Sequence, residues 1–428
     1  MNIVFISPGC FPFTKISSLA DLVCKLSKEV ERLGHNVKIF IPRYSFIEPS
    51  TFHIERIPMD LKVRFNEKYL PTSVYKGIIP NSLASVFLIE SQNYFSNSLD
   101  GEKFNFFCTA VLDVILRLKF ETDIIHLFNT ETACAIKLLH SKNTEYKALD
   151  KASIILTIND LREPGENLLK ETINKSDFIT TVSESCLQGF LLPTQYTVIP
   201  SSIDEEIYNP EIDNKTAQTY TKEYFSLGKR KCKEELLELT GLSNDLQMPL
   251  FGIVSKLIHE NGLDILLDTL PQFGHLKLQL VVLDSAQELI NTANKYKNIK
   301  VINGYDHIFA KKIYAGCDFF VDLNKNEFCG TSTMIALKYG AIPITYLRGV
   351  IKDIIIDIEV SDESNGIVFK NYNKEDLLEG INKALKNYKD KERWTKLIKQ
   401  AMSFDSSKFD TTKKYVGCYE KILKKQPV

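Results

Sequence analysis

Residues 2–41 read NIVFISPGCFPFTKISSLADLVCKLSKEVERLGHNVKIFI, and this stretch decides the fold. Asn2–Ser7 has the apolar, β-branched character of a buried strand, and Val37–Ile41 has the same character. Between them, apolar residues recur at helical spacing until Gly34. A strand, a helix and a strand in this order predict a right-handed βαβ unit with parallel strands buried on both faces. The helix positions that should face the core are Leu19, Leu22, Val23, Leu26, Val30 and Leu33.

The same alternation of short apolar runs and helix-length segments continues along the chain. It predicts an α/β protein with two doubly wound, Rossmann-like, parallel-sheet domains. The first domain should contain the strands Ile124–Leu127, Ile154–Ile158, Phe178–Val182 and Val198–Pro200. The second should contain Phe251–Val254, Leu278–Leu283, Ile299–Ile302, Phe319–Val321 and Ile342–Thr345.

The segment from Asp213 to Gln247 is polar, dense in charge and without strand character, so it is predicted to connect the two domains. We place the boundary near Asp245, which gives an N-terminal domain of residues 1–245 and a second domain of residues 246–403. Near the end of the sequence, Tyr415 and Tyr419 fall at four-residue spacing and predict a helix within residues 404–423.

Composition narrows the classes of function. The 53 Lys and Arg residues nearly balance the 54 Asp and Glu residues, so no basic field exists to hold nucleic acid or an anionic membrane. Nine scattered cysteines without a C-x-x-C pair argue against disulfides and against a zinc or other metal site. The first residues read as a strand rather than a signal peptide, and no apolar run is long enough to span a membrane. We therefore expect a cytoplasmic protein with a small-molecule or neutral-polymer partner.

The first predicted strand is followed by a loop that could bind an anion. Phe13–Asp21 reads FTKISSLAD and places Lys15 and the amides of Ser17 and Ser18 at a helix N-terminus, where the helix dipole is positive. A second interpretation needs no ligand, because either serine can cap the helix while Lys15 stays solvated.

The corresponding loop of the second domain follows Phe319–Val321. Backbone N–H groups of Cys329, Gly330 and Thr331 open a helix there and could hold a phosphate. Glu327, just before them, could accept hydrogen bonds from sugar hydroxyls. An acidic residue near the start of a helix is also explained by the helix dipole alone.

Two further strands are followed by candidate ligand-binding residues. Lys256 follows Phe251–Val254 and could face a leaving phosphate, or it could be an ordinary surface charge. Tyr305, in the sequence NGYD after another strand, offers a flat ring to a nucleobase, although a packing tyrosine is an equal alternative.

Taken in order, these segments resemble the bacterial glycogen synthase and plant starch synthase family from one end of the chain to the other. The matching stretches include Phe13–Asp21, Leu33–Val37, Pro42–Tyr44, Asp123–His126, Thr181–Ser183, Gly252–Ser255, Gly304–Asp306, Ile313–Gly316 and Ala336–Gly340.

The resemblance implies a GT-B fold, in which the two domains face a central cleft and a C-terminal helix, here within residues 404–428, completes the first domain. It also implies retaining α-1,4 transfer from ADP-glucose, bound mainly by the second domain, to a glucan end on the first, with no other cofactor. By the same resemblance, Glu327, Lys256 and Asp21 are the catalytic candidates. Lys15, Ser17, Ser18, Lys256, Tyr305, Cys329, Gly330 and Thr331 are the candidates for holding the nucleotide sugar.

The sequence departs from the family where those contacts should be. Ser17 and Ser18 replace two glycines, and Phe128 replaces a histidine. Asn159 and Asp160 replace a histidine–asparagine pair, Lys256 and Asn261 an arginine–lysine pair, and Asp284 the start of a glycine-rich turn. We expect these altered positions to face the cleft and to remove contacts that stabilise the transition state.

Two hypotheses follow. In the first, ADP-glucose transfer is weak or lost, and the protein works by binding glucan or a protein partner such as an active synthase. In the second, the protein is an active glycosyltransferase with an altered donor or acceptor.

Overall fold

The computed structural model describes residues 1–14, 18–91, 94–95, 102–141, 144–159, 165–187, 196–259 and 262–424. The chain forms two compact units, one of Met1–Ser201 with Phe409–Val428 and one of Ser202–Lys408, and each is treated by itself below. Within the described ranges, no helix is both long and apolar enough to cross a membrane.

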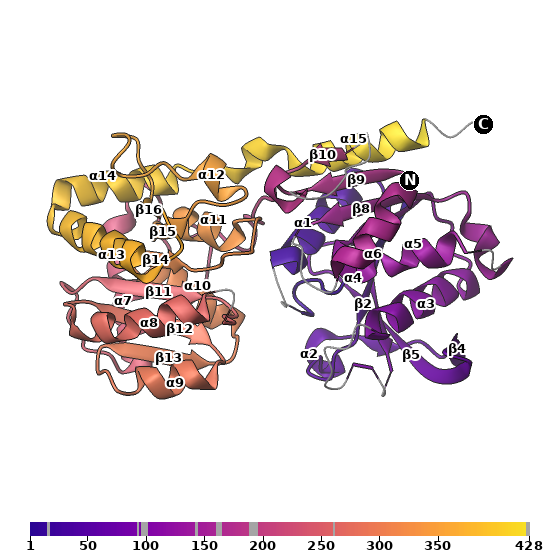
Figure 1. Ribbon diagram of the computed structural model, residues 1–428, viewed down its shortest axis with the longest axis horizontal. Helices are drawn as coiled ribbons and strands as arrows, with labels where there is room; N and C mark the ends of the chain where they lie inside the picture. The colour runs from indigo at the N-terminus through magenta and orange to yellow at the C-terminus, as the bar shows by residue number, and fades with distance from the viewer. Residues whose placement is uncertain are drawn as a thin grey trace. The chain divides into compact units, whose positions relative to one another are not determined.

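The first unit is built on one ten-stranded sheet (Figure 1). Its strands are β1 (Asn2–Ile6), β2 (Asn36–Pro42), β3 (Glu55–Arg56), β4 (Leu61–Phe65), β5 (Lys68–Ile78), β6 (Ser85–Glu90), β7 (Ile124–Phe128), β8 (Ser153–Ile158), β9 (Phe178–Thr181) and β10 (Tyr196–Val198). The order across the sheet is β10-β9-β8-β7-β1-β2-β6-β5-β3, with β4 paired to β5. The helices are α1 (Ser18–Arg32), α2 (Pro49–Phe52), α3 (Glu102–Arg117), α4 (Asn129–Thr132), α5 (Cys134–Leu139), α6 (Gly165–Thr172) and α15 (Thr411–Leu423).

The predicted βαβ unit is confirmed. Strand β1 pairs in parallel with β2, with Ile3 opposite Val37, and α1 connects them. Gly34 adopts a φ of 86° just after α1, and its N–H bonds to the carbonyl of Glu31, so a glycine stops the helix as expected. Leu33 lies beyond the end of α1 and is exposed, whereas the other predicted core positions of this helix are buried.

An antiparallel hairpin was not predicted. Strands β4 and β5 pair with Phe65 opposite Lys68, and the two residues between them, Asn66 and Glu67, both have positive φ. This is the geometry of a tight two-residue hairpin turn. The hairpin and β3 extend the parallel sheet at the side of β6 and add a mixed edge to a sheet that the sequence predicts as parallel.

The C-terminal helix α15 packs beside α1 in the first unit (Figure 1). Tyr415 and Tyr419 are fully buried there, and Thr411 donates a hydrogen bond to the carbonyl of Pro200. The first unit is therefore made of two segments of the chain that are far apart in sequence.

The second unit is built on a six-stranded, wholly parallel sheet in the order β13-β12-β11-β14-β15-β16. Its strands are β11 (Leu250–Val254), β12 (Gln279–Asp284), β13 (Ile299–Asn303), β14 (Phe319–Asp322), β15 (Ile342–Tyr346) and β16 (Ile367–Phe369). Its helices are α7 (Phe225–Thr240), α8 (Leu263–His275), α9 (Gln287–Ala293), α10 (His307–Gly316), α11 (Thr331–Lys338), α12 (Ile351–Ile354), α13 (Lys374–Lys389) and α14 (Lys391–Met402).

The structure divides the chain at Ser201, not near Asp245, because the intervening segment packs in the second unit, where Lys229 and Lys233 are buried. The Lys229 ammonium on α7 donates to the carbonyls of Ala315, Cys317 and Tyr339, each at 3.1 Å. Lys233, one turn later, pairs with Asp318 at 2.7 Å. Two lysines of this segment thus belong to an internal network of the second unit.

Candidate functional site

The strand order of the second sheet changes direction between β11 and β14. Strand β12 follows β11 on one side, while β14 lies on the other. Loops leave such a point in opposite directions, and ligands of α/β sheets bind there, beyond the carboxyl ends of the strands. Ser255, directly after β11, donates a 2.9 Å hydrogen bond to the side chain of Asn324, just after β14. This bond joins the two loops across the point where the strand order reverses.

Lys256 follows Ser255 and is exposed, as a group that meets a ligand must be. The turn that carries it is held by Asp284 at the end of β12. One carboxylate oxygen of Asp284 accepts from the N–H of Leu257 at 2.7 Å, and the other accepts from the N–H of Ala286 at 2.6 Å. Burial raises the pKa of Asp284, and the two amides and the charge of Lys256 oppose that rise. Asp284 is therefore buried and hydrogen-bonded to the backbone. Contrary to the expectation of the sequence analysis, it does not lie on a ligand-facing surface.

The Glu327 loop connects β14 to α11. Glu327 is half-buried, and Cys329, Gly330 and Thr331 are buried at the start of the eight-residue helix α11. Gly330 has a φ of 67°, and a Cβ there would come within 3.1 Å of Ile351. The loop thus needs a glycine at this position to bring its backbone to the helix N-terminus.

Arg348 was missed by the sequence analysis, although it organises this loop. It follows β15, is 4% exposed, and forms an ion pair with Asp322 at the end of β14, in which Nη2 contacts both carboxylate oxygens. Its Nε also donates to the carbonyl of Glu327 at 2.8 Å. No sequence pattern marks a single arginine after a strand as internal, because its partner lies in a different loop.

Tyr305 lies at the carboxyl end of β13, after Gly304, whose φ is 91°. Its side chain is 46% exposed, so the ring is accessible to a ligand. The next residue, Asp306, caps α10 by accepting from the N–H of Phe309 at 2.7 Å. Of the predicted residues, the structure places Lys256, Tyr305, Glu327, Cys329, Gly330 and Thr331 along the carboxyl edge of this one sheet.

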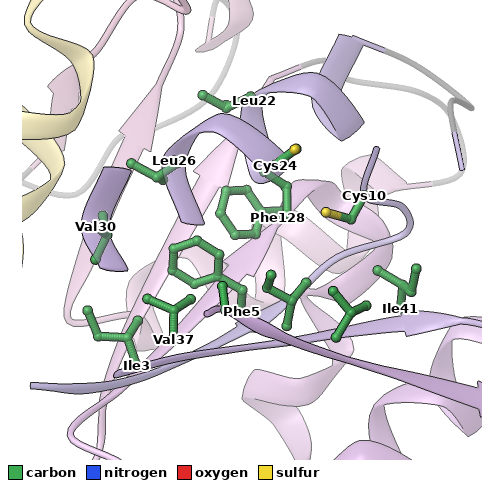
Figure 2. Packing of buried hydrophobic residues seen from close by; sticks show 14 of the residues in the cluster. Ile3, Phe5, Cys10, Leu22, Cys24, Leu26, Val30, Val37, Ile41 and Phe128 are labelled. Atoms are coloured by element: carbon green, nitrogen blue, oxygen red, sulfur yellow. The ribbon is translucent and has the colours of Figure 1, made fainter. Parts of the chain in front are cut away.

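In the first unit, Phe128 belongs to the hydrophobic core. It is fully buried, its ring meets that of Phe5 edge to face at 5.1 Å (Figure 2), and it stacks on His126 at 4.0 Å. The expectation that Phe128 faces a ligand is therefore wrong. An apolar ring fits this position because its neighbours are core residues.

The carboxyl ends of β7 and β8 meet through two asparagines. Asn129 has a positive φ of 62°, and its side-chain oxygen accepts from the backbone N–H of Asn159 at 2.8 Å. Both residues are buried, and the side-chain amide of Asn159 has no hydrogen-bond partner among the described residues. Buried amides are normally paired, so this one is a candidate ligand group.

Ser18 begins α1, and Asp21 lies buried in its first turn, where an acidic side chain favours the helix dipole. Both belong to the first unit, whereas Glu327 and Lys256 belong to the second. The other proposed positions, Lys15, Ser17, Asp160 and Asn261, lie outside the described residues.

Comparisons with known proteins agree with this arrangement. The profile of the starch synthase catalytic domain matches residues 2–165, and that of the glycosyl transferases group 1 matches residues 242–401. A glycogen synthase of Geotalea uraniireducens is 30% identical over 99% of each chain, and one of Bacillus cytotoxicus is 30% identical over 99% of this chain and 100% of its own. The catalytic domain of starch synthase IV from Arabidopsis thaliana, solved with ADP and acarbose, has a TM-score of 0.88, 23% identity and 99% coverage of each chain.

Proposed function

Because this chain belongs to the glycogen and starch synthase family of GT-B fold, we propose that it binds a nucleotide sugar through its second unit and an α-glucan through its first. We propose further that glucosyl transfer from ADP-glucose is weak or lost. The Arabidopsis relative was solved with ADP and acarbose, which supports ligands of these two classes.

Asp284 is the observation that carries the second part of the proposal. Its carboxylate accepts from the amides of Leu257 and Ala286, so those N–H groups are used inside the protein. It also adds a negative charge near Lys256, the cation expected to face a departing diphosphate. Diphosphate departure needs donors and cations aimed at the developing charge. If each lost contact costs about 2–4 kcal/mol, two or three losses slow transfer roughly 10⁴-fold or more.

Because transfer is weak or lost in this proposal, the protein works by binding either glucan or a protein partner such as an active synthase. We expect this to occur in the cytoplasm. All nine cysteines lie within the described residues, are buried and form no disulfide, which fits a reducing compartment.

The alternative is an active glycosyltransferase with an altered donor or acceptor. One observation favours it: the Glu327 loop is held in place by buried hydrogen bonds, notably from Arg348, and an ordered loop is what donor binding requires. A search for transfer must therefore include donors other than ADP-glucose.

The test is a transfer assay with radiolabelled ADP-glucose or UDP-glucose and glycogen, beside an ordinary glycogen synthase. We expect slow transfer by the unmodified protein and faster transfer by a Lys256→Arg, Asn261→Lys, Asp284→Gly variant. Phe128 is left unchanged because it is a core residue. Transfer from ADP-glucose at the rate of the reference enzyme would contradict weakened catalysis, and transfer from UDP-glucose alone would establish the alternative.

Calorimetry with ADP, ADP-glucose and maltooligosaccharides tests binding separately from transfer. We expect binding of at least one of them. Should none bind, the nucleotide-sugar and glucan roles fail, and only the protein-partner role is left.

A further inference from the structure

Asp322 and Arg348 form a buried ion pair at the carboxyl edge of the second sheet. They are 3% and 4% exposed, and Nη2 of Arg348 donates to both carboxylate oxygens at 2.8 Å. Their strands, β14 and β15, are neighbours, so the ion pair links the carboxyl ends of these two strands. Charged side chains are this deeply buried only when paired and hydrogen-bonded.

The guanidinium of Arg348 is 4% exposed, and its hydrogen bonds are made to protein groups. Besides the two to Asp322, Nε donates to the carbonyl of Glu327, and Nη1 donates to the hydroxyl of Thr345 and the carbonyl of Tyr346. Arg348 can therefore serve a ligand only by holding other groups in place.

Asp322 also forms hydrogen bonds with the other loops of the site. Its carboxylate accepts from the hydroxyl of Thr333 in α11 at 2.8 Å, and from the backbone and side-chain N–H groups of Asn324 at 3.1 Å each. The side-chain oxygen of Asn324 in turn accepts from Ser255, the residue before Lys256. An unbroken chain of hydrogen bonds thus runs from the residue beside Lys256 to the carbonyl of Glu327.

A second contact ties the same loops together. The N–H of Val350 donates to the carbonyl of Phe328 at 3.0 Å. Gly349 lies against that backbone, since a Cβ at this position would come within 2.4 Å of the Phe328 carbonyl oxygen. The loop that carries Glu327 is therefore held at two successive carbonyls, that of Glu327 by Arg348 and that of Phe328 by Val350.

A purely stabilising role does not explain this arrangement. Replacing a buried ion pair by apolar residues of similar volume often leaves stability unchanged, because desolvation offsets the attraction. The same unit offers a comparison in Lys233 and Asp318, also buried and paired, at the amino ends of β11 and β14. That pair lies at the other edge of the sheet and contacts none of the candidate ligand groups.

We propose, on the basis of the proposed function, that Arg348, held by Asp322, is a positioning residue that sets Glu327 relative to Lys256. It thereby supports recognition of the sugar of a nucleotide-sugar donor, which Glu327 would contact, more than recognition of the diphosphate, which Lys256 would contact. The consequence is measurable as a preference between a nucleotide sugar and the matching nucleoside diphosphate.

The experiment compares two double variants by calorimetry with ADP and with ADP-glucose, and with UDP and UDP-glucose in parallel. Asp322→Leu with Arg348→Met removes the site pair, and Asp318→Leu with Lys233→Met removes the control pair. For each variant, the dissociation constant of the diphosphate is divided by that of the sugar nucleotide. In the site variant we expect this ratio to fall about tenfold, because one or two hydrogen bonds that support sugar binding are lost. The affinity for the diphosphate alone, and the ratio in the control variant, should stay within about threefold.

A single variant, Arg348→Lys, separates charge from geometry. A lysine keeps the positive charge but has no planar fork with which to bind Asp322 and the Glu327 carbonyl together, so we expect it to lose the sugar preference as well. Retention of the full preference in Arg348→Lys or in the site variant, or an equal loss in the control variant, would overturn the positioning role. If the unmodified protein binds none of the four nucleotides, the donor part of the proposed function and this proposal fail together. An unchanged ratio overturns this proposal alone.

Discussion

His126 and Tyr419 lie 293 residues apart in the chain and share a 2.8 Å hydrogen bond between Nδ1 and the phenolic oxygen. The other ring nitrogen of His126 bonds the hydroxyl of Thr157 at 2.6 Å, and Thr157 also contacts Thr180 and Tyr415. These buried groups join α15 to β7, β8 and β9. The last helix is thus fixed to the first unit by polar contacts as well as by apolar packing.

The first prediction concerns this bond. Tyr419→Phe keeps the ring but leaves Nδ1 of a buried histidine without its partner, so the first unit should lose about 1–3 kcal/mol of unfolding free energy. Hydrogen exchange of the β7 amides, followed by mass spectrometry, measures the loss. Tyr224→Phe is the control, because Tyr224 is 83% exposed and its change should stay within about 0.5 kcal/mol. Equal exchange in the two variants would contradict the prediction.

The second prediction is a pH dependence. Burial lowers the pKa of His126 from 6.5 to about 3, so the folded protein holds this ring neutral while the unfolded chain protonates it. The unfolded state binds the extra proton between these values. Stability from His126 is therefore complete above pH 6.5 and falls by about 1.4 kcal/mol per pH unit below it.

The measurement is the difference in unfolding free energy between the unmodified protein and His126→Asn, which lacks the titrating ring. Between pH 7.5 and pH 5.0 this difference should shrink by about 2 kcal/mol. A difference that stays constant would show that His126 does not titrate in this way.

The third prediction uses two glycines in opposite surroundings. Gly417 lies in α15, and a Cβ at this position would meet no atom within 4 Å, so Gly417→Ala should stabilise the protein by about 0.5–1 kcal/mol. Gly349 has a φ of 45°, and a Cβ there meets the Phe328 backbone, so Gly349→Ala should destabilise by about 1–3 kcal/mol. Thermal unfolding of both variants tests the opposite signs, and a stabilising Gly349→Ala would show that the loop is looser than its contacts indicate.

The fourth prediction concerns Lys229, whose pKa is lowered by burial and whose ammonium bonds three carbonyls. Lys229→Met removes these donors and should cost about 2–4 kcal/mol. Trp394, the one tryptophan of the chain, lies buried in α14 of the same unit and reports unfolding by its fluorescence. Lys231→Met is the matched control on the exposed side of α7, and an equal effect of the two substitutions would contradict the assignment.

Local periodicity was enough to predict most of the parallel strands and α1. Buried parallel strands are continuous apolar runs, and most of those runs, such as Ile154–Ile158, became strands, whereas Val198–Pro200 overlaps β10 at Val198 alone. The β4–β5 hairpin was harder to see, because one of its faces is solvated and its strands alternate buried and exposed residues. Its signal was the turn residue Asn66, which tolerates positive φ.

The errors about side chains arose from contacts between distant segments. The segment that contains Lys229 and Lys233 was interpreted as a connector, because the carbonyl of Ala315 and the carboxylate of Asp318 that bind these lysines lie 86 and 85 residues further on. Phe128 read as a ligand-facing substitution, because a sequence shows which residue changed and not which side of the strand it faces. The positions of Glu327 and Lys256 after strands were predictable, but the contacts of Arg348 were not, because they depend on Asp322.

The two-segment build of the first unit has a consequence for synthesis. All of Ser202–Lys408 must be translated before α15 exists. At about 5–20 residues per second, the surface over β7 and β8 that receives Tyr415 and Tyr419 waits about 10–40 s for its cover. During that interval His126 lacks its partner Tyr419 and Thr157 lacks Tyr415, so the first unit completes its folding only after the second unit has been translated.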